Sequence, residues 1–81
     1  MKKTFEIGKT YKCIDTRMTP ITVFDRKKMT IMVKNNKYGE YSMRVHNDYE
    51  HEYVVDDKHV SSNLRGLFCY IADSEIEGEI K

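Results

Sequence analysis

The sequence has few of the residues and segments that are typical of disordered proteins, of membrane-spanning proteins or of small proteins stabilised by disulfides. It contains one proline, four glycines, two cysteines and no tryptophan among its 81 residues. Proline and glycine are too few for a disordered tract, and no apolar run reaches the roughly 18 residues of a transmembrane helix. The N-terminus begins like a signal peptide, but Glu6 and Lys9 interrupt the apolar stretch that would follow. We therefore expect a cytoplasmic protein with no membrane partner.

The length predicts one domain, residues 1–81, with a single thin core. Cys13 and Cys69 are expected to be thiols in a reducing compartment, because disulfides rarely persist there. If the first and last strands of the domain pair, the two cysteines come close enough to bridge under oxidation.

Charge is segregated between the two halves of the chain. Residues 1–45 hold eleven Lys/Arg and four Asp/Glu, a net charge of +7, and residues 46–81 hold three and nine, a net charge of −6. Such asymmetry indicates a basic surface for nucleic acid, an acidic surface for a protein, or two halves that neutralise each other. The sequence alone does not decide among these three interpretations.

Apolar residues alternate with polar ones at a period of two, which is typical of half-buried strands. The predicted strands span residues 10–14, 21–26, 29–34, 41–45, 53–55 and 67–72. Turn-forming residues separate them at intervals of about eight to twelve residues. This pattern predicts an all-β fold with five or six strands, either a small SH3-like barrel or a strongly bent antiparallel sheet.

Two segments depart from this pattern. Residues 57–64 start with Asp57, and Gly66 lies just beyond them, which predicts either a short helical turn with a capped start and a left-handed end or an ordered loop. Residues 73–81 alternate acidic and isoleucine residues, and form either an edge strand or a frayed tail.

The alternation also divides the side chains between the two faces of the sheet. The predicted core consists of Tyr11, Ile21, Val23, Ile31, Val33, Met43, Val45, Val54, Leu67, Cys69 and Ile71. The opposite face then carries cations together with apolar and aromatic residues, which resembles a platform for single-stranded nucleic acid. The candidate nucleic-acid-binding residues are Lys12, Phe24, Arg26, Lys27, Lys28, Lys34, Lys37 and Arg44. The alternative is a solvated face whose lysines protect sheet edges.

A second candidate surface is acidic and contains tyrosine. Its residues are Asp48, Tyr49, Glu50, Glu52 and Tyr53. Exposed tyrosines are enriched in protein interfaces, so this patch suits a basic protein partner, and its alternative is an ordinary polar loop. A homodimer in which the basic and acidic surfaces meet is a third possibility.

No motif points to a metal, a cofactor or catalysis. His46, His51 and His59 lie near carboxylates, but no Cys-x-x-Cys or His-x-x-x-His spacing supports a zinc site. The chain has no glycine-rich phosphate loop and no nucleophile motif. We therefore expect a protein that is not an enzyme and binds no cofactor.

The order of several short motifs resembles a group of known proteins. These motifs are Phe5-x-Ile7-Gly8-Lys9-x-Tyr11, Val23-Phe24-x-Arg26, Ile31-x-Val33, Met43-Arg44-Val45 and Glu52-Tyr53-Val54. The chain resembles small β-rich accessory proteins of phages, plasmids and integrative elements of Firmicutes. The resemblance implies an accessory, non-enzymatic protein of the bacterial cytosol. Some proteins of this kind inhibit host defence nucleases, and no catalytic or binding residue is carried over.

Overall fold

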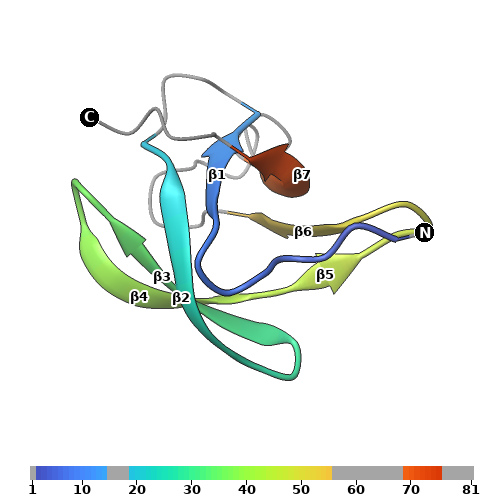
Figure 1. The fold of residues 1–81 in the computed structure, drawn as a ribbon, viewed down its shortest axis with the longest axis horizontal. Helices are drawn as coiled ribbons and strands as arrows, with labels where there is room; N and C mark the ends of the chain where they lie inside the picture. The colour runs from blue at the N-terminus through green and yellow to red at the C-terminus, as the bar shows by residue number, and fades with distance from the viewer. Residues whose placement is uncertain (1, 15–18, 56–68, 76–81) are drawn as a thin grey trace.

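The computed structural model describes residues 2–14, 19–55 and 69–75, which form one antiparallel sheet (Figure 1). Its strands are β1 (Thr10–Cys13), β2 (Ile21–Lys27), β3 (Thr30–Asn35), β4 (Gly39–Arg44), β5 (His46–Asn47), β6 (Glu52–Val55) and β7 (Cys69–Glu75). They lie in the order β4-β3-β2-β1-β7-β6-β5. These residues contain no helix, and hence none long and apolar enough to cross a membrane. The predicted all-β, barrel-like sheet is confirmed.

The sheet has seven strands, so the predicted number of five or six is wrong. The difference arises because β4 and β5 follow each other through the single buried residue Val45. β4 pairs with β3, whereas β5 pairs with β6 at the other end of the strand order. The chain therefore bends at Val45 and nearly closes the sheet (Figure 1). The predicted helical turn near 57–64 lies outside the described residues. Of the tail 73–81, only residues 73–75 are described, and they belong to β7.

Strand β2 contains a bulge at its centre. Val23 pairs with Val33, but the next pair along the strands is Asp25 with Met32. Phe24 and Asp25 together therefore oppose one residue of β3, and beyond this point the alternation of faces is shifted by one residue. Phe24 and Asp25 are both exposed, so the regular alternation predicted for residues 21–26, which would place Asp25 on the inner face with Val23, is wrong at this position.

The inner face of the sheet holds the core. Eight predicted core residues are buried, namely Tyr11, Ile21, Val23, Ile31, Val33, Met43, Val45 and Val54. They are joined by Phe5, Cys13, Tyr70 and Ala72.

The prediction fails in β7, where Tyr70 and Ala72 are buried and Cys69 and Ile71 are only half-buried. Tyr70 of β7 pairs with Cys13 of β1, and the two side chains point to the same face of the sheet. The neighbouring Cys69 therefore points to the opposite face. No disulfide joins the two cysteines. Leu67, also predicted in the core, lies outside the described residues.

The N-terminal segment runs beside the start of β6. The Lys3 amide donates to the Glu50 carbonyl, and the Glu52 amide donates to the Lys3 carbonyl, both at 2.9 Å. Phe5 then enters the core, where its ring meets the Tyr11 ring edge-on at 4.9 Å. Lys3 and Phe5 are therefore part of the packed domain.

Lys28 occupies a strained position in the two-residue turn between β2 and β3. Its φ angle is 54°, in the left-handed region that disfavours residues with a Cβ atom. We expect Lys28→Gly to raise the free energy of unfolding by up to about 1 kcal/mol, as measured by urea denaturation. Lys27→Gly is the matched control, since it removes the same charge from a strand position and should lower stability by about 0.5–1 kcal/mol. Equal losses in the two variants would contradict the strain argument.

Candidate functional site

Three cations of the predicted nucleic-acid-binding set gather at the tip of the β2–β3 hairpin. Lys27 pairs with Thr30, which in turn pairs with Arg44 on β4. An open groove at this end of the sheet is lined by Lys27, Lys28, Met29, Thr30 and Arg44. All five of these residues are exposed, and among the described residues no Asp or Glu lines the groove. The groove is therefore a compact basic site.

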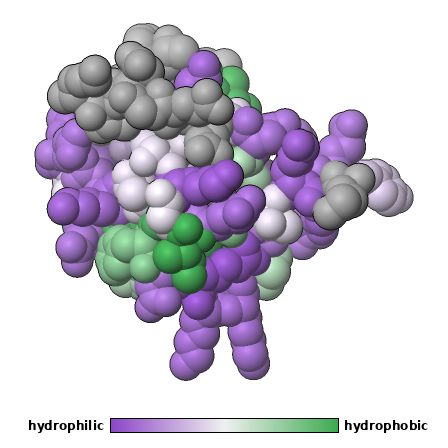
Figure 2. Space-filling view, in the orientation of Figure 1, coloured by the Kyte–Doolittle hydropathy of each residue, from purple (hydrophilic) through white to green (hydrophobic). Residues whose placement is uncertain are grey.

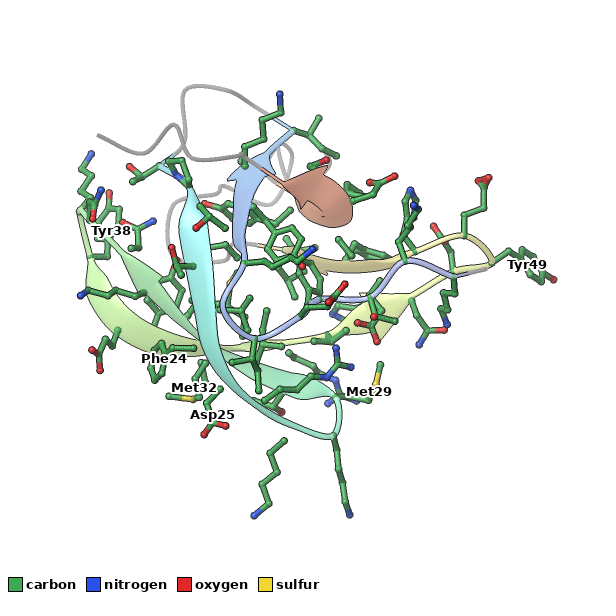
Figure 3. The ribbon with its side chains drawn as sticks, viewed as in Figure 1. Phe24, Asp25, Met29, Met32, Tyr38 and Tyr49 are labelled. Atoms are coloured by element: carbon green, nitrogen blue, oxygen red, sulfur yellow. The ribbon has the colours of Figure 1, made fainter. Side chains whose placement is uncertain are left out.

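An apolar patch adjoins this basic groove on the outer face. Phe24 is 42% exposed because it follows the buried Val23 and so points to the opposite face, and Met32 of β3 is half-buried beside it. Their side chains point away from the sheet on the same side (Figure 3). The exposed Ile7 lies close by, since the amide of the next residue, Gly8, donates to the Val23 carbonyl at 2.7 Å. Figure 2 shows the resulting apolar patch over β2, surrounded by hydrophilic residues.

The other predicted cations are spread over the sheet outside the groove. Lys12 is exposed on β1, and Lys34 is exposed on β3 directly opposite Glu40 of β4, which partly offsets its charge. Lys37 lies in the β3–β4 turn with its Nζ 5.3 Å from the centre of the Tyr38 ring. These three lysines lie on different elements outside the groove and do not form one site.

Arg26 does not belong to the outer face, contrary to prediction. The bulge turns it inward, where its Nη1 and Nη2 donate to the two carboxylate oxygens of Glu52 at 2.6 and 2.7 Å. Nη1 also donates to the Phe5 carbonyl at 3.1 Å, while Glu52 accepts the Phe5 amide at 2.9 Å. These hydrogen bonds, first of all those from Arg26, lower the pKa of Glu52. The pair is a structural ion pair that ties the N-terminal segment to β2 and β6.

The Arg26–Glu52 ion pair removes Glu52 from the predicted acidic surface. Glu52 is 5% exposed and therefore cannot contact a partner, and Tyr53 is half-buried with its ring stacked on His46 at 5.4 Å. Asp48, Tyr49 and Glu50 remain exposed in the β5–β6 turn, with Tyr49 fully exposed at its tip (Figure 3).

Asp48 has a local structural role in that turn. Its Oδ1 accepts the amides of His51 and Glu50, at 2.9 and 2.8 Å, which is the geometry of an Asx turn. These bonds, that of His51 first, lower the pKa of Asp48. Within residues 2–14, 19–55 and 69–75, no group of three or more His, Cys, Asp or Glu side chains is placed to hold a metal ion.

Sequence reasoning missed two residues of the outer-face site. Regular alternation along the predicted strands places Met32 outward, without assigning it to a site, and places Asp25 inward. A carboxylate at an inner position interrupts the apolar pattern at Asp25, but alternation alone does not place a bulge there.

Comparison with protein-family models, with curated proteins and with solved structures finds no significant match. The basic groove and the exposed Phe24 ring on the same sheet are consequently the features that indicate a function.

Proposed function

We propose that this protein is a non-catalytic nucleic-acid-binding module that uses the outer face of β2, β3 and β4. The observation that carries the proposal is the groove lined by Lys27, Lys28 and Arg44, which adjoins the exposed ring of Phe24. Cations gathered in a groove neutralise phosphates and release their counterions, which drives binding. An exposed ring beside them offers a surface on which a base can stack.

The acidic surface is the alternative site, for a basic protein. Three of its five residues, Asp48, Tyr49 and Glu50, are exposed, whereas Glu52 is committed to Arg26. The basic groove keeps three adjacent cations, so it supports a function better than the acidic turn does.

We also propose that the sheet is an SH3-like barrel and that the protein is a cytoplasmic accessory protein of mobile-element type. The first is supported by the β2–β3–β4 meander with β1 beside β2 and the last strand beside β1. The second rests on the sequence resemblance alone.

The binding proposal is tested by fluorescence anisotropy with a labelled oligonucleotide, from about 20 to about 300 mM salt. We expect an affinity that falls steeply with salt, because each phosphate contact contributes a slope of about −0.7 to −0.9 in a logarithmic plot. Replacing Lys27 and Arg44 together by glutamine should weaken binding about five- to tenfold at low salt and reduce the slope by roughly one to two units.

Two single variants are measured beside this double variant, Lys2→Gln as a charge control and Lys28→Gly as a further groove variant. Lys2 donates to Asn47 on β5, away from the groove, and controls for net charge alone. Lys28→Gly removes a groove cation and relieves backbone strain, so any loss of affinity cannot be assigned to unfolding. Absence of binding at the lowest salt, or equal losses for Lys2→Gln and the groove variants, would refute the proposal.

A further inference from the structure

The carboxylate of Asp25 lies on the proposed binding face of β2, β3 and β4, between Phe24 and the basic groove. Asp25 is exposed in the bulge of β2, next to Phe24 and opposite Met32 (Figure 3). Its Oδ1 accepts the amide of Arg26 at 2.8 Å, and its Oδ2 has no partner among the described residues. This hydrogen bond holds the carboxylate in place, and it leaves Oδ2 and the second lone pair of Oδ1 to accept from a ligand.

This position is unfavourable for a surface that binds only phosphates. A negative charge two residues from Lys27 weakens the attraction of the face for a phosphate backbone. A carboxylate is, however, the acceptor that reads the donor groups of bases. Its neighbour Phe24 supplies the stacking surface that would bring a base edge within its reach.

The bulge in β2 places the side chains of Phe24 and Asp25 on the same face. In a regular strand Phe24 and Asp25 would point to opposite faces, since consecutive side chains alternate. Because both oppose Met32, both project on the outer face, within one Cα–Cα step of about 3.8 Å. A ring and an acceptor on adjacent residues of one face can contact a single stacked base and one of its edges.

The chemistry of the acceptor selects among the bases. Guanine presents two neighbouring donors, N1–H and N2–H, on its Watson–Crick edge, and a carboxylate accepts both. Thymine presents one donor between two carbonyl oxygens that repel the carboxylate, and adenine and cytosine place a ring acceptor next to their amino group. In a duplex this edge is occupied by the pairing partner, so the base must be unpaired.

Building on the proposed function, we propose that Phe24 and Asp25 form a recognition site for an unpaired guanine base in single-stranded nucleic acid. Phe24 stacks on the base, Asp25 accepts hydrogen bonds from its N1–H and N2–H groups, and Lys27, Lys28 and Arg44 hold the neighbouring phosphates.

The test compares three labelled oligothymidylates of equal length, one unaltered, one with a single central dG, and one with a central deoxyinosine. A single guanine cannot form a quadruplex, and inosine lacks only the N2 amino group. We expect the dG strand to bind about tenfold more tightly than oligothymidylate, with the inosine strand between them. The dG strand annealed to its complement should lose this advantage.

Asp25→Asn provides a signature that a loss of folding does not produce. It should reduce the dG preference to less than about threefold while it strengthens binding of plain oligothymidylate, because the repulsion of phosphates is removed. Phe24→Leu should weaken binding of all three single strands by about threefold to tenfold. Asp73→Asn, at an exposed position on β7, is the control and should leave the preference unchanged.

The outcomes separate this inference from the proposed function. Salt-dependent binding with equal affinities for the dG, inosine and thymidine strands overturns the guanine site and leaves nucleic-acid binding in place. Duplex binding as tight as that of the dG strand also overturns it. Absence of binding to every oligonucleotide at the lowest salt overturns both proposals.

Discussion

Replacing Glu52 by glutamine should lower the free energy of unfolding by about 3 kcal/mol, since the loss of one partner leaves a buried charge uncompensated. The Glu52 side chain is 7% exposed and that of Arg26 is 21% exposed, so water replaces the lost carboxylate only in part. Glutamine keeps one acceptor for the Phe5 amide, but its side-chain amide NH₂ faces the Arg26 guanidinium. Both groups are hydrogen-bond donors, so they cannot pair.

Thermal denaturation at neutral pH measures this loss. For a domain of this size, 3 kcal/mol corresponds to a fall in Tm of roughly 12–24 °C. Glu50→Gln is the matched control, because Glu50 is exposed two residues away, and it should change stability by less than about 0.5 kcal/mol. Replacing both Arg26 and Glu52 by methionine should recover part of the loss, since no charge is then left unpaired. A Glu52→Gln variant as stable as Glu50→Gln would show that the pair contributes nothing.

The same pair predicts how stability depends on pH. The pKa of Glu52 is lowered in the folded protein from its ordinary value of 4.5, first by the hydrogen bonds from Arg26. A lowered pKa means that the unfolded chain binds the proton more readily. The stabilisation is therefore complete above about pH 4.5 and is lost as the pH falls through the folded pKa. The stability difference between the wild type and Glu52→Gln should shrink over this range. Asp48, whose pKa is lowered too, is present in both proteins and cancels in the comparison.

Asn35→Ala is expected to have the second-largest effect, a loss of about 2 kcal/mol in the free energy of unfolding. Asn35 is 3% exposed at the end of β3, and its Oδ1 accepts the amides of Lys37 and Tyr38 at 2.7 and 3.1 Å. Its Nδ2 donates to the Thr19 carbonyl at 3.3 Å. Alanine removes all three bonds and leaves buried polar atoms to be satisfied by water, at about 1 kcal/mol or less for each partly exposed group.

Urea denaturation of Asn35→Ala and Asn36→Ala side by side checks this expectation. Asn36 is the neighbouring, exposed residue of the same turn, so the two variants share composition and differ in burial. We expect Asn36→Ala to change stability by less than about 0.5 kcal/mol. Similar losses in both variants would mean that the turn depends on backbone propensity, not on the buried amide.

The period-two pattern predicted the inner faces of β1, β3 and β4 correctly, because regular strands translate alternation directly into burial. It failed where the register shifts. The bulge in β2 moved Asp25 out and Arg26 in, and an irregularity between β1 and β7 accompanies the inner position of Tyr70. A bulge inserts one residue without a strong sequence signature, so its position is decided by the partner strand.

The site was predictable to the extent that it is local. Lys27, Lys28 and Phe24 belong to one hairpin, and their proximity follows from chain connectivity. The loss of Arg26 and Glu52 from the two predicted surfaces was not predictable, since the pair joins residues 26 positions apart in the sequence. Burial of a complementary charge pair depends on the closed arrangement of the sheet, which alternation does not encode.

The contacts that close the sheet have a consequence for the order of folding. Phe5 meets Glu52, and the Tyr70 hydroxyl donates to the Thr19 carbonyl at 2.7 Å, over sequence separations of 47 and 51 residues. Contacts of such separation form slowly, because the entropy of a long loop must be overcome first. The β2–β3–β4 meander is built from neighbouring hairpins and needs neither chain end. During synthesis on the ribosome, the face that we assign to nucleic acid would thus be assembled before the domain around it is closed.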